Sequence, residues 1–242
     1  TFRYLKVGTG NAIADFLGAG PVKRDLASIE KAPVRWLDLM RVNGRRTTFA
    51  GFGWDAQILN DYERMREQAE RFDVTRAVFK TIVGYLATAF LKSVPELVAS
   101  KSSWTVRVIN TGDEAFRLGP DGIVAERFSK GSVVYEGPAA MGCVGTTPYY
   151  GYKLNIMPWA DKTAGMFQMR LLDMHPLQAV QRLRKAWNGT LQHPGVHDFH
   201  LSSCRVEIEG DAPFQIAGDA EGQTSEVDIQ MEHPIRCAQF EG

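Results

Sequence analysis

The sequence predicts an α+β fold whose larger part is an antiparallel β-sandwich or barrel, with one long helix and one shorter helix. Two observations carry this prediction. Apolar runs of strand length, each bounded by turn residues, recur from residue 33 almost to the C-terminus, which is typical of antiparallel β folds. The pair Asn43-Gly44 separates two of these runs, and Asn-Gly in such a place is the strongest short signal for a hairpin.

The composition is that of a folded protein without a strong charge. The chain has 242 residues, of which 44% are hydrophobic, and its 28 basic residues balance 28 acidic ones. No global positive field exists to attract nucleic acid, so we expect no nucleic-acid partner. The three cysteines are widely spaced, which argues against a disulfide framework and fits a reducing cytoplasm. No apolar run approaches the roughly 18 residues of a membrane span, and no signal peptide is evident.

Residues 1–18 differ from the rest of the chain in the order of their predicted elements. Tyr4 to Val7 indicate a strand end, Gly8-Thr9-Gly10-Asn11 a turn, and Ala12 to Gly18 the start of a helix. A helix that follows a glycine loop offers free backbone N–H groups to an anion. A strand so close to residue 1 has no earlier element to pair with, so we expect that further residues precede it in the natural protein.

The remaining elements follow in order. Val34 to Val42 and Thr47 to Phe52 form the predicted hairpin, and apolar residues at helical spacing predict a long helix from Asp61 to Leu91. A second helix is predicted from Pro176 to Trp187. The other predicted strands are Trp104 to Asn110, Ile123 to Phe128, Val133 to Tyr135, Met166 to Leu172, Cys204 to Ile208, Phe214 to Ile216 and Val227 to Met231.

Several acids and histidines stand where they can carry chemistry. Asp55 follows a strand end and a glycine, Gly53, and either serves a site or caps a helix. Asp38 lies inside an apolar run, so it must face solvent or meet a cation. Asp219 and Glu221 lie in a glycine turn after a strand, which is also the composition of a solvated hairpin tip.

Three histidines, His193, His197 and His200, are spaced closely enough to suggest a zinc site. Pro194 and Gly195 break any helix that would align them, so we predict a polar loop instead.

These segments, in this order, resemble the catalytic family of diacylglycerol kinases, which includes bacterial lipid kinases and sphingosine kinases. The resemblance spans nearly the whole chain with similar spacings. The segments that carry it are Gly8 to Leu17, Trp36 to Leu39, Val42 to Gly44, Gly51 to Ala56, Gly165 to Phe167 and Gln215 to Gly222.

The resemblance implies an α/β nucleotide-binding domain followed by a β-sandwich domain that supplies the lipid site, with ATP in the cleft between them. Residues 1–32 are then the C-terminal tail of the ATP-binding domain, and residues 33–242 are the β-sandwich domain. The Gly-Gly-Asp-Gly loop that binds nucleotide phosphates in this family stands upstream of the Gly-Thr-Gly-Asn motif and is not in this chain. The chain therefore corresponds to the lipid-binding half.

The resemblance also implies roles for single residues. Gly8, Thr9, Gly10 and Asn11 contact the nucleotide, and Asp38 belongs to an acidic network that holds Mg²⁺.

Gly53 and Asp55 are the residues expected to bind the lipid substrate. The family's general base is the first residue of an Asp-Gly-Glu turn, but alignment places Ala217 there, so Asp219, or less readily Glu221, has to substitute. Two further departures are Ala12, which replaces an aspartate of many bacterial members, and Ala164, which replaces the ligand of a structural metal.

The implied activity is ATP-dependent phosphorylation of a lipid hydroxyl of the diacylglycerol or long-chain-base type, with Mg²⁺ as cofactor. The alternatives are a non-catalytic lipid-binding or regulatory homologue, which Ala12 and Ala217 favour, and a relative of NAD kinases with a soluble substrate. Either way we expect a cytoplasmic protein with peripheral contact at the inner membrane face, and a homodimer is compatible with the sequence.

Overall fold

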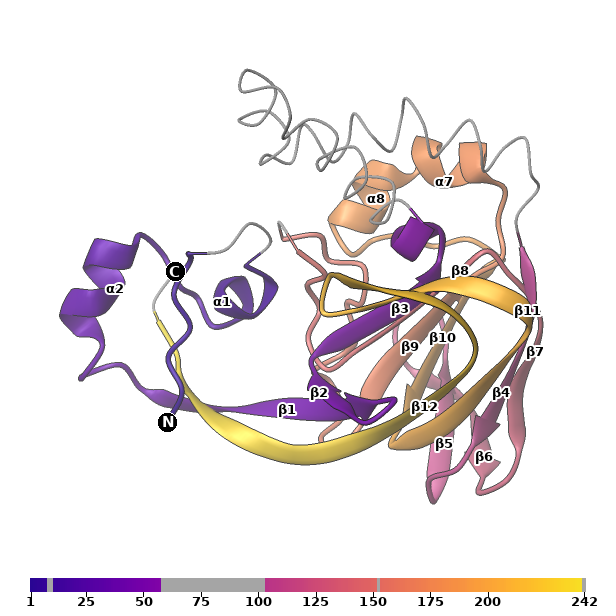
Figure 1. Cartoon of the computed structure of the whole chain (residues 1–242), viewed down its shortest axis with the longest axis horizontal. Coiled ribbons are helices and arrows are strands. Elements are labelled where there is room, and N and C mark those ends of the chain that lie inside the picture. Colours follow the sequence, from indigo (N-terminus) through magenta and orange to yellow (C-terminus); the bar gives the residue numbers. More distant parts are fainter. Residues whose placement is uncertain (8–10, 58–102, 152, 241–242) are drawn as a thin grey trace.

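A computed structural model describes residues 1–7, 11–57, 103–151 and 153–240 of the chain (Figure 1). The long helix predicted at residues 61–91 lies outside this range. The helices are α1 (Ala12–Phe16), α2 (Val22–Ser28), α7 (Pro176–Gln181) and α8 (Leu183–Trp187). The strands are β1 (Val34–Val42), β2 (Arg45–Thr47), β3 (Phe49–Gly53), β4 (Trp104–Asn110), β5 (Glu114–Leu118), β6 (Val124–Ser129), β7 (Val133–Ala139), β8 (Met141–Gly145), β9 (Phe167–Leu172), β10 (Val196–Leu201), β11 (Ser203–Ile216) and β12 (Asp219–Ala238).

The strands form one 12-stranded antiparallel sheet in the order β2-β1-β12-β11-β3-β8-β9-β10-β5-β6, and β4 joins β11 to β7. The long hairpin of β11 and β12 organises it. One edge of β11 pairs with β12, while the other pairs with β4 over Cys204 to Ile208 and with β3 over Phe214 to Ile216. The sheet curves around its inner face (Figure 1), so the predicted α+β, mainly β-sandwich class is confirmed.

The main core lies on the inner face of the curved sheet. Phe167, Phe199 and Val206, from three different strands, are completely buried there. A second hydrophobic cluster includes Phe49 of β3 and Cys143 of β8. These side chains pack with apolar residues that mostly come later in the chain. Strand β9 contributes Leu171 to the first cluster and Leu172 to the second. All of its residues are buried, including the polar Gln168 and the charged Arg170.

The predicted turn at Asn43-Gly44 is confirmed, but its second strand is the short β2; the predicted partner run, Thr47 to Phe52, falls mostly in β3, which pairs with β8 and β11. Both turn residues have positive φ, 46° and 84°, as a type I′ turn requires. The single helix predicted from Pro176 to Trp187 is interrupted instead, because Arg182 adopts φ −105° and ψ 6° between α7 and α8.

Four strands were not predicted: β2, β5, β8 and β10. The polar loop expected around the histidines was wrong for His197 and His200, which lie in β10. This strand pairs with β9 on one side and β5 on the other, so its polar side chains find partners inside the fold.

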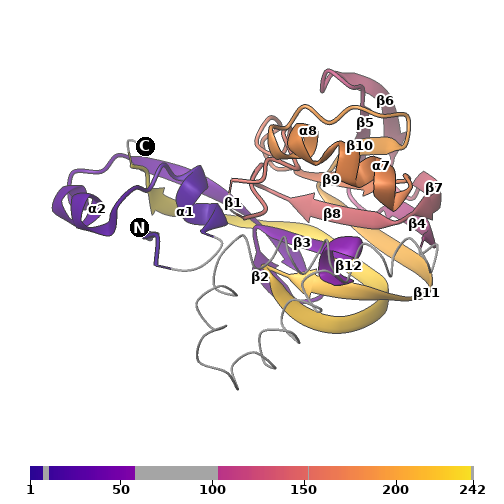
Figure 2. The ribbon, with the colours of Figure 1, turned by 90° about the horizontal axis from the view of Figure 1, so that it is seen from above.

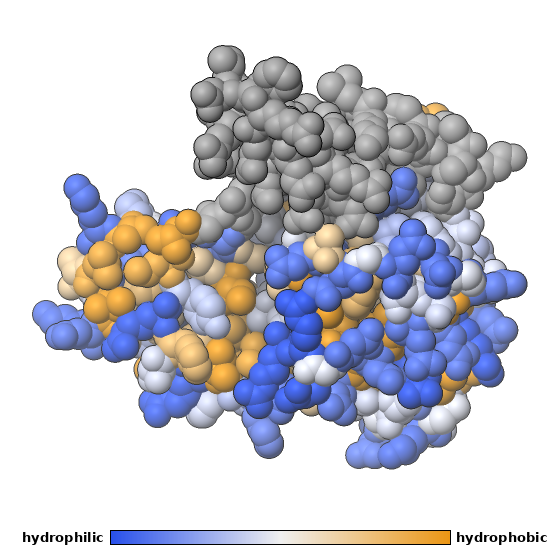
Figure 3. All heavy atoms as spheres, in the orientation of Figure 1, coloured by the Kyte–Doolittle hydropathy of each residue, from blue (hydrophilic) through white to orange (hydrophobic). Residues whose placement is uncertain are grey.

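The N-terminal segment packs on a two-stranded extension of the sheet. The ends of β1 and β12 project from the body, and α1 and α2 lie beside them (Figures 1 and 2). Leu17, directly after α1, is buried there with Leu37 and Cys237. Apolar residues gather on the surface of this end (Figure 3), where Phe2 and Trp36 remain 56% and 61% exposed. The predicted domain boundary after residue 32 stays a prediction. None of the described helices is long and apolar enough to cross a bilayer.

The cysteines provide a first testable prediction. Cys143, Cys204 and Cys237 are free thiols and all are buried, and burial raises the pKa of each. A thiol with a raised pKa forms little thiolate, the reactive species. We expect none of the three to react with iodoacetamide at pH 8 in the native protein and all three to react in denaturant, as counted by intact-mass spectrometry. Rapid native labelling would contradict the packing described here.

Candidate functional site

A buried carboxylate, Asp55, marks the candidate site. Strand β3 ends at Gly53, whose φ is 85°. A Cβ added at this position would clash with the carbonyl oxygen of Ala140. Only glycine fits this position. Residues 54–57 are helical, so the chain turns sharply and carries Asp55 inward, where it is only 8% exposed. Of the two predicted substrate residues, Gly53 therefore shapes the backbone, and Asp55 supplies the functional group.

Asp55 is held by two polar side chains from distant segments. Its Oδ2 accepts hydrogen bonds from the Tyr150 hydroxyl and, at 3.1 Å, from Gln215 Nε2. Gln215 Nε2 also contacts the Tyr150 oxygen. The other end of the Gln215 amide, Oε1, accepts from the backbone N–H of Gly218 at 2.9 Å. The end of β3, the loop after β8 and the β11–β12 turn are thus joined in one network.

The environment of Asp55 favours its neutral form. Burial raises the pKa of its carboxyl to about 6, and the hydrogen bonds from Tyr150 and Gln215 act in the opposite direction. Its second oxygen, Oδ1, is buried and has no hydrogen-bond partner within the described residues. A buried acceptor without a partner costs roughly 1–3 kcal/mol. Asp55 thus combines a buried acceptor oxygen, without a partner in the described part of the chain, with a carboxyl whose pKa lies near neutral pH.

Gly51 sits directly under this network. A Cβ at Gly51 would overlap the Tyr150 hydroxyl and Asp55 Oδ2. We expect Gly51→Ala to lower the free energy of unfolding by about 1–3 kcal/mol, as overpacking does, and to separate Asp55 from Tyr150. Urea denaturation checks the first effect. Gly137→Ala is the matched control in a strand, since its Cβ would meet nothing closer than 3.3 Å. Equal stability losses in the two variants would contradict the close packing around Asp55.

The predicted catalytic turn lies next to the network but on the surface. Ala217 and Gly218 form the turn, with φ of 57° and 88°, and β12 begins at Asp219. The Asp219 side chain is 72% exposed and lies 3.7 Å from Arg45. Glu221 forms an ion pair with the same arginine. The structure thus places both acids near one cation, and Gln215 links their turn to Asp55.

The predicted nucleotide and metal residues are described only in part. Gly8, Thr9 and Gly10 lie outside the described residues. Asn11 has a left-handed conformation, with φ of 50°, at the start of α1. Asp38 lies at an irregularity of β1. Its carbonyl oxygen accepts from the Thr146 hydroxyl at 2.7 Å, and its half-buried carboxylate has no partner among the described residues.

The histidines serve the packing of β10. His200 bonds to the Thr163 hydroxyl at 2.9 Å and to the Trp159 carbonyl at 2.8 Å. The ring of His197 lies against Tyr135. Within the described ranges, no three side chains of metal-ligand type come together.

Sequence reasoning missed two members of the network. Gln215 lies in a matched motif but has no assigned role there. Tyr150 lies in a loop without any pattern, and its hydroxyl reaches Asp55 across 95 positions of sequence. Only the tertiary structure identifies it, since no spacing signal connects the two.

Three solved structures from Bacillus anthracis, each described as a diacylglycerol kinase, share the fold. They are 14–17% identical to this chain, their TM-scores are 0.59–0.60, and each covers 96% of it. The chain spans 64–67% of their length. At such identity the likeness shows the fold, not the activity. No protein-family model matches the sequence, and neither does any curated protein.

Proposed function

We propose that this chain is the lipid-binding half of a lipid kinase, which transfers the γ-phosphoryl group of ATP to a lipid hydroxyl. The observation that carries the proposal is the buried Asp55 carboxylate, with one oxygen held by Tyr150 and Gln215 and the other without a partner within the described residues. The fold shared with structures described as diacylglycerol kinases supports the same class of reaction.

Asp55 suits the task of binding and activating a hydroxyl. With a pKa of about 6, it is mostly ionised at pH 7.5, so Oδ1 can accept a hydrogen bond from the lipid hydroxyl. A base with a pKa near the working pH is also well matched to remove the proton as the hydroxyl oxygen attacks phosphorus. Tyr150 and Gln215 keep the carboxylate in one orientation, which leaves Oδ1 for the substrate.

Asp219 and Glu221 are the second candidates for the base. Both lie on the surface with Arg45, and Asp219 belongs to the turn that Gln215 anchors. A shift of that turn would bring Asp219 toward the substrate. Both are exposed and share one cation, whereas Asp55 is buried within the hydrogen-bond network, so Asp55 is the preferred base in this proposal.

The nucleotide side is proposed from the resemblance. The segment from Gly8 to Asn11 would bind ATP. The carboxylate of Asp38, which has no partner among the described residues, fits a Mg²⁺ that is bound by one or two carboxylates and by substrate phosphates. Mg²⁺, when bound, offsets the phosphate charge. The residues of this chain then have to orient the hydroxyl and hold its proton.

Phosphoryl transfer to a lipid panel tests the reaction class. Radiolabelled ATP is offered to the full-length natural protein with diacylglycerol, monoacylglycerol, sphingosine and ceramide, and with NAD as the soluble alternative. We expect label in one of the lipids and none in NAD. Label in NAD alone would contradict the proposal, and lipid binding without any transfer would identify a non-catalytic homologue.

A further inference from the structure

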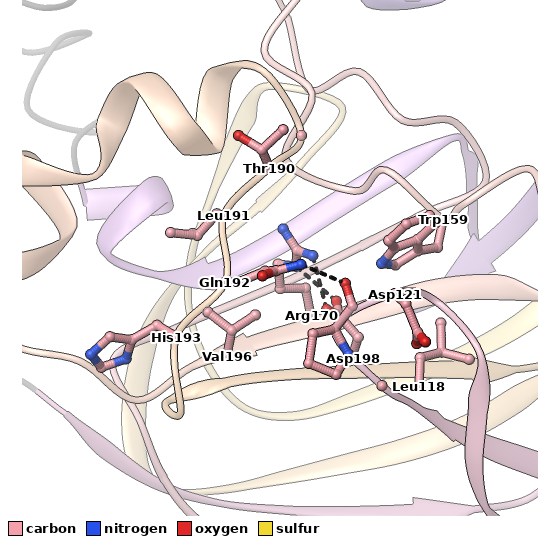
Figure 4. A pocket seen from close by; sticks show the side chains of 13 residues that line it. Leu118, Asp121, Trp159, Arg170, Thr190, Leu191, Gln192, His193, Val196 and Asp198 are labelled. Carbon is pink, nitrogen blue, oxygen red and sulfur yellow. Dashed lines mark hydrogen bonds and ion pairs between the residues drawn. The ribbon is translucent and has the colours of Figure 1, made fainter.

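A cavity away from Asp55 contains a buried cation with unused donors. The cavity has a volume of about 280 Å³ and is bounded by the β5–β6 turn, the segment after α8 and strands β9 and β10. Arg170 lies at the centre of the side chains that line it (Figure 4). None of Asp55, Tyr150 and Gln215 belongs to this lining, so the cavity is separate from the candidate site.

The Arg170 guanidinium is fixed on one side only. Its Nε and Nη2 donate to the two carboxylate oxygens of Asp198 at 2.7 and 2.8 Å. Gln168 Nε2 donates to the same carboxylate at 2.6 Å. Since the guanidinium is planar, this pairing directs Nη1 away from Asp198. The Arg170 side chain is 2% exposed, and Nη1 is buried without a hydrogen-bond partner among the residues that the structure describes.

An unpaired buried donor on a charged group is costly, so the Nη1 position requires an acceptor. Nη1 has almost no exposed area, and the nearby rim contains the exposed residues Thr190 and Gln192. Gln192 closes the rim with a single exposed hydrogen bond to the Pro120 carbonyl, at 3.0 Å. Breaking a single exposed hydrogen bond costs little free energy, because water replaces it. An acceptor can therefore reach Nη1 when Gln192 swings outward.

The charges of the lining select against anions. Asp198 already neutralises Arg170, and the exposed Asp121 adds a further negative charge. His193 accepts a hydrogen bond through Nδ1 from the Gly195 N–H at 3.0 Å, so that nitrogen is already occupied and does not donate into the cavity. A carboxylate or phosphate would enter a lining with net negative charge. A neutral oxygen acceptor would not meet this repulsion.

The remaining lining of the cavity is mainly apolar and includes one aromatic ring. Leu118, Leu191 and Val196 line it together with Trp159. The Trp159 ring lies against Gly122, where an added Cβ would come within 2.7 Å of the ring. An apolar body with one acceptor at its end matches such a wall.

We propose that this cavity is a binding site for a small neutral molecule that carries a carbonyl or amide oxygen on an apolar body, with Arg170 Nη1 as the donor. The site lies outside the proposed lipid and nucleotide sites, so its occupancy does not depend on kinase activity.

Three probes of similar shape test the proposal: benzamide, benzoate and toluene. Each is titrated into the whole chain and followed by ¹H–¹⁵N NMR. We expect benzamide to bind about tenfold or more tightly than toluene, the ratio that one hydrogen bond to a charged group provides, and also more tightly than benzoate. Benzamide binding no tighter than toluene, or benzoate binding tightest, would overturn the proposal.

Two variants locate the binding. Val196→Phe fills the cavity and leaves Arg170 and Asp198 paired, so it should abolish benzamide binding; unchanged affinity would place the ligand elsewhere and overturn the proposal. Asp121→Asn removes the rim charge, so it should strengthen benzoate binding and leave benzamide unchanged. An equal effect on both ligands would contradict the selection by charge. Circular dichroism confirms that each variant is folded.

Discussion

Arg170→Met is expected to lower the free energy of unfolding by about 3–5 kcal/mol, because it leaves the buried Asp198 carboxylate without its cation. Asp198 is 6% exposed, so water from the cavity replaces the two lost hydrogen bonds only in part. Among the described residues, Gln168 alone would still donate to it. Denaturation in urea with a fluorescence readout measures the loss.

The double variant Arg170→Met/Asp198→Leu is the control for this effect. It removes both charges and replaces them with apolar side chains of similar volume, a change that buried ion pairs often tolerate well. We expect it to recover at least half of the stability that the single variant loses; Gln168, left without its acceptor, limits the recovery. A double variant less stable than the single one would show that the pair itself contributes most of the stability.

We expect the buried carboxyl of Asp55 to make the free energy of unfolding depend strongly on pH. Burial raises the pKa of Asp55 from 3.8 to about 6 in the folded state. The folded state therefore binds more protons than the unfolded state between these values, and stability falls as pH rises through this window. A shift of about two units corresponds to about 3 kcal/mol.

The variant Asp55→Asn isolates this contribution, because asparagine resembles the protonated acid in shape and does not titrate. The free energy of unfolding of the natural protein, minus that of Asp55→Asn, should decrease by about 2–3 kcal/mol between pH 3.5 and pH 8. Asp219→Asn, at an exposed position, should show no comparable change. A difference that is constant with pH, or one that grows as pH rises, would mean that Asp55 is not the desolvated carboxyl described here.

The sequence predicted the strands whose apolar residues face a core in a regular pattern. The turn at Asn43-Gly44 was predictable because its geometry depends on local residue chemistry. Strand β10 was not, because Asp198 and His200 are buried polar residues and His197 is partly buried, and their partners come from other strands and loops. A pattern of hydrophobicity cannot anticipate a buried arginine such as Arg170, since only the folded structure supplies its carboxylate.

The candidate site was predictable to a similar extent. Asp55 was identified because a glycine and a strand end precede it. Its two partners were not, because Tyr150 lies in an irregular loop and Gln215 reaches Asp55 across 160 positions of sequence. The exposure of Asp219 also depends on tertiary packing, because the same turn sequence is compatible with a buried or a solvated tip.

In the proposed reaction, the Asp55 carboxylate binds the lipid hydroxyl and takes its proton. The most direct test measures the rate of phosphoryl transfer to the preferred lipid of the panel, at saturating ATP and pH 7.5, for the full-length protein and its Asp55→Asn and Asp219→Asn variants. We predict that Asp55→Asn lowers the rate about 10²–10⁴-fold, the usual contribution of a general base, while Asp219→Asn retains most of it. Full activity of Asp55→Asn together with an inactive Asp219→Asn would contradict the account and assign the proton transfer to the β11–β12 turn.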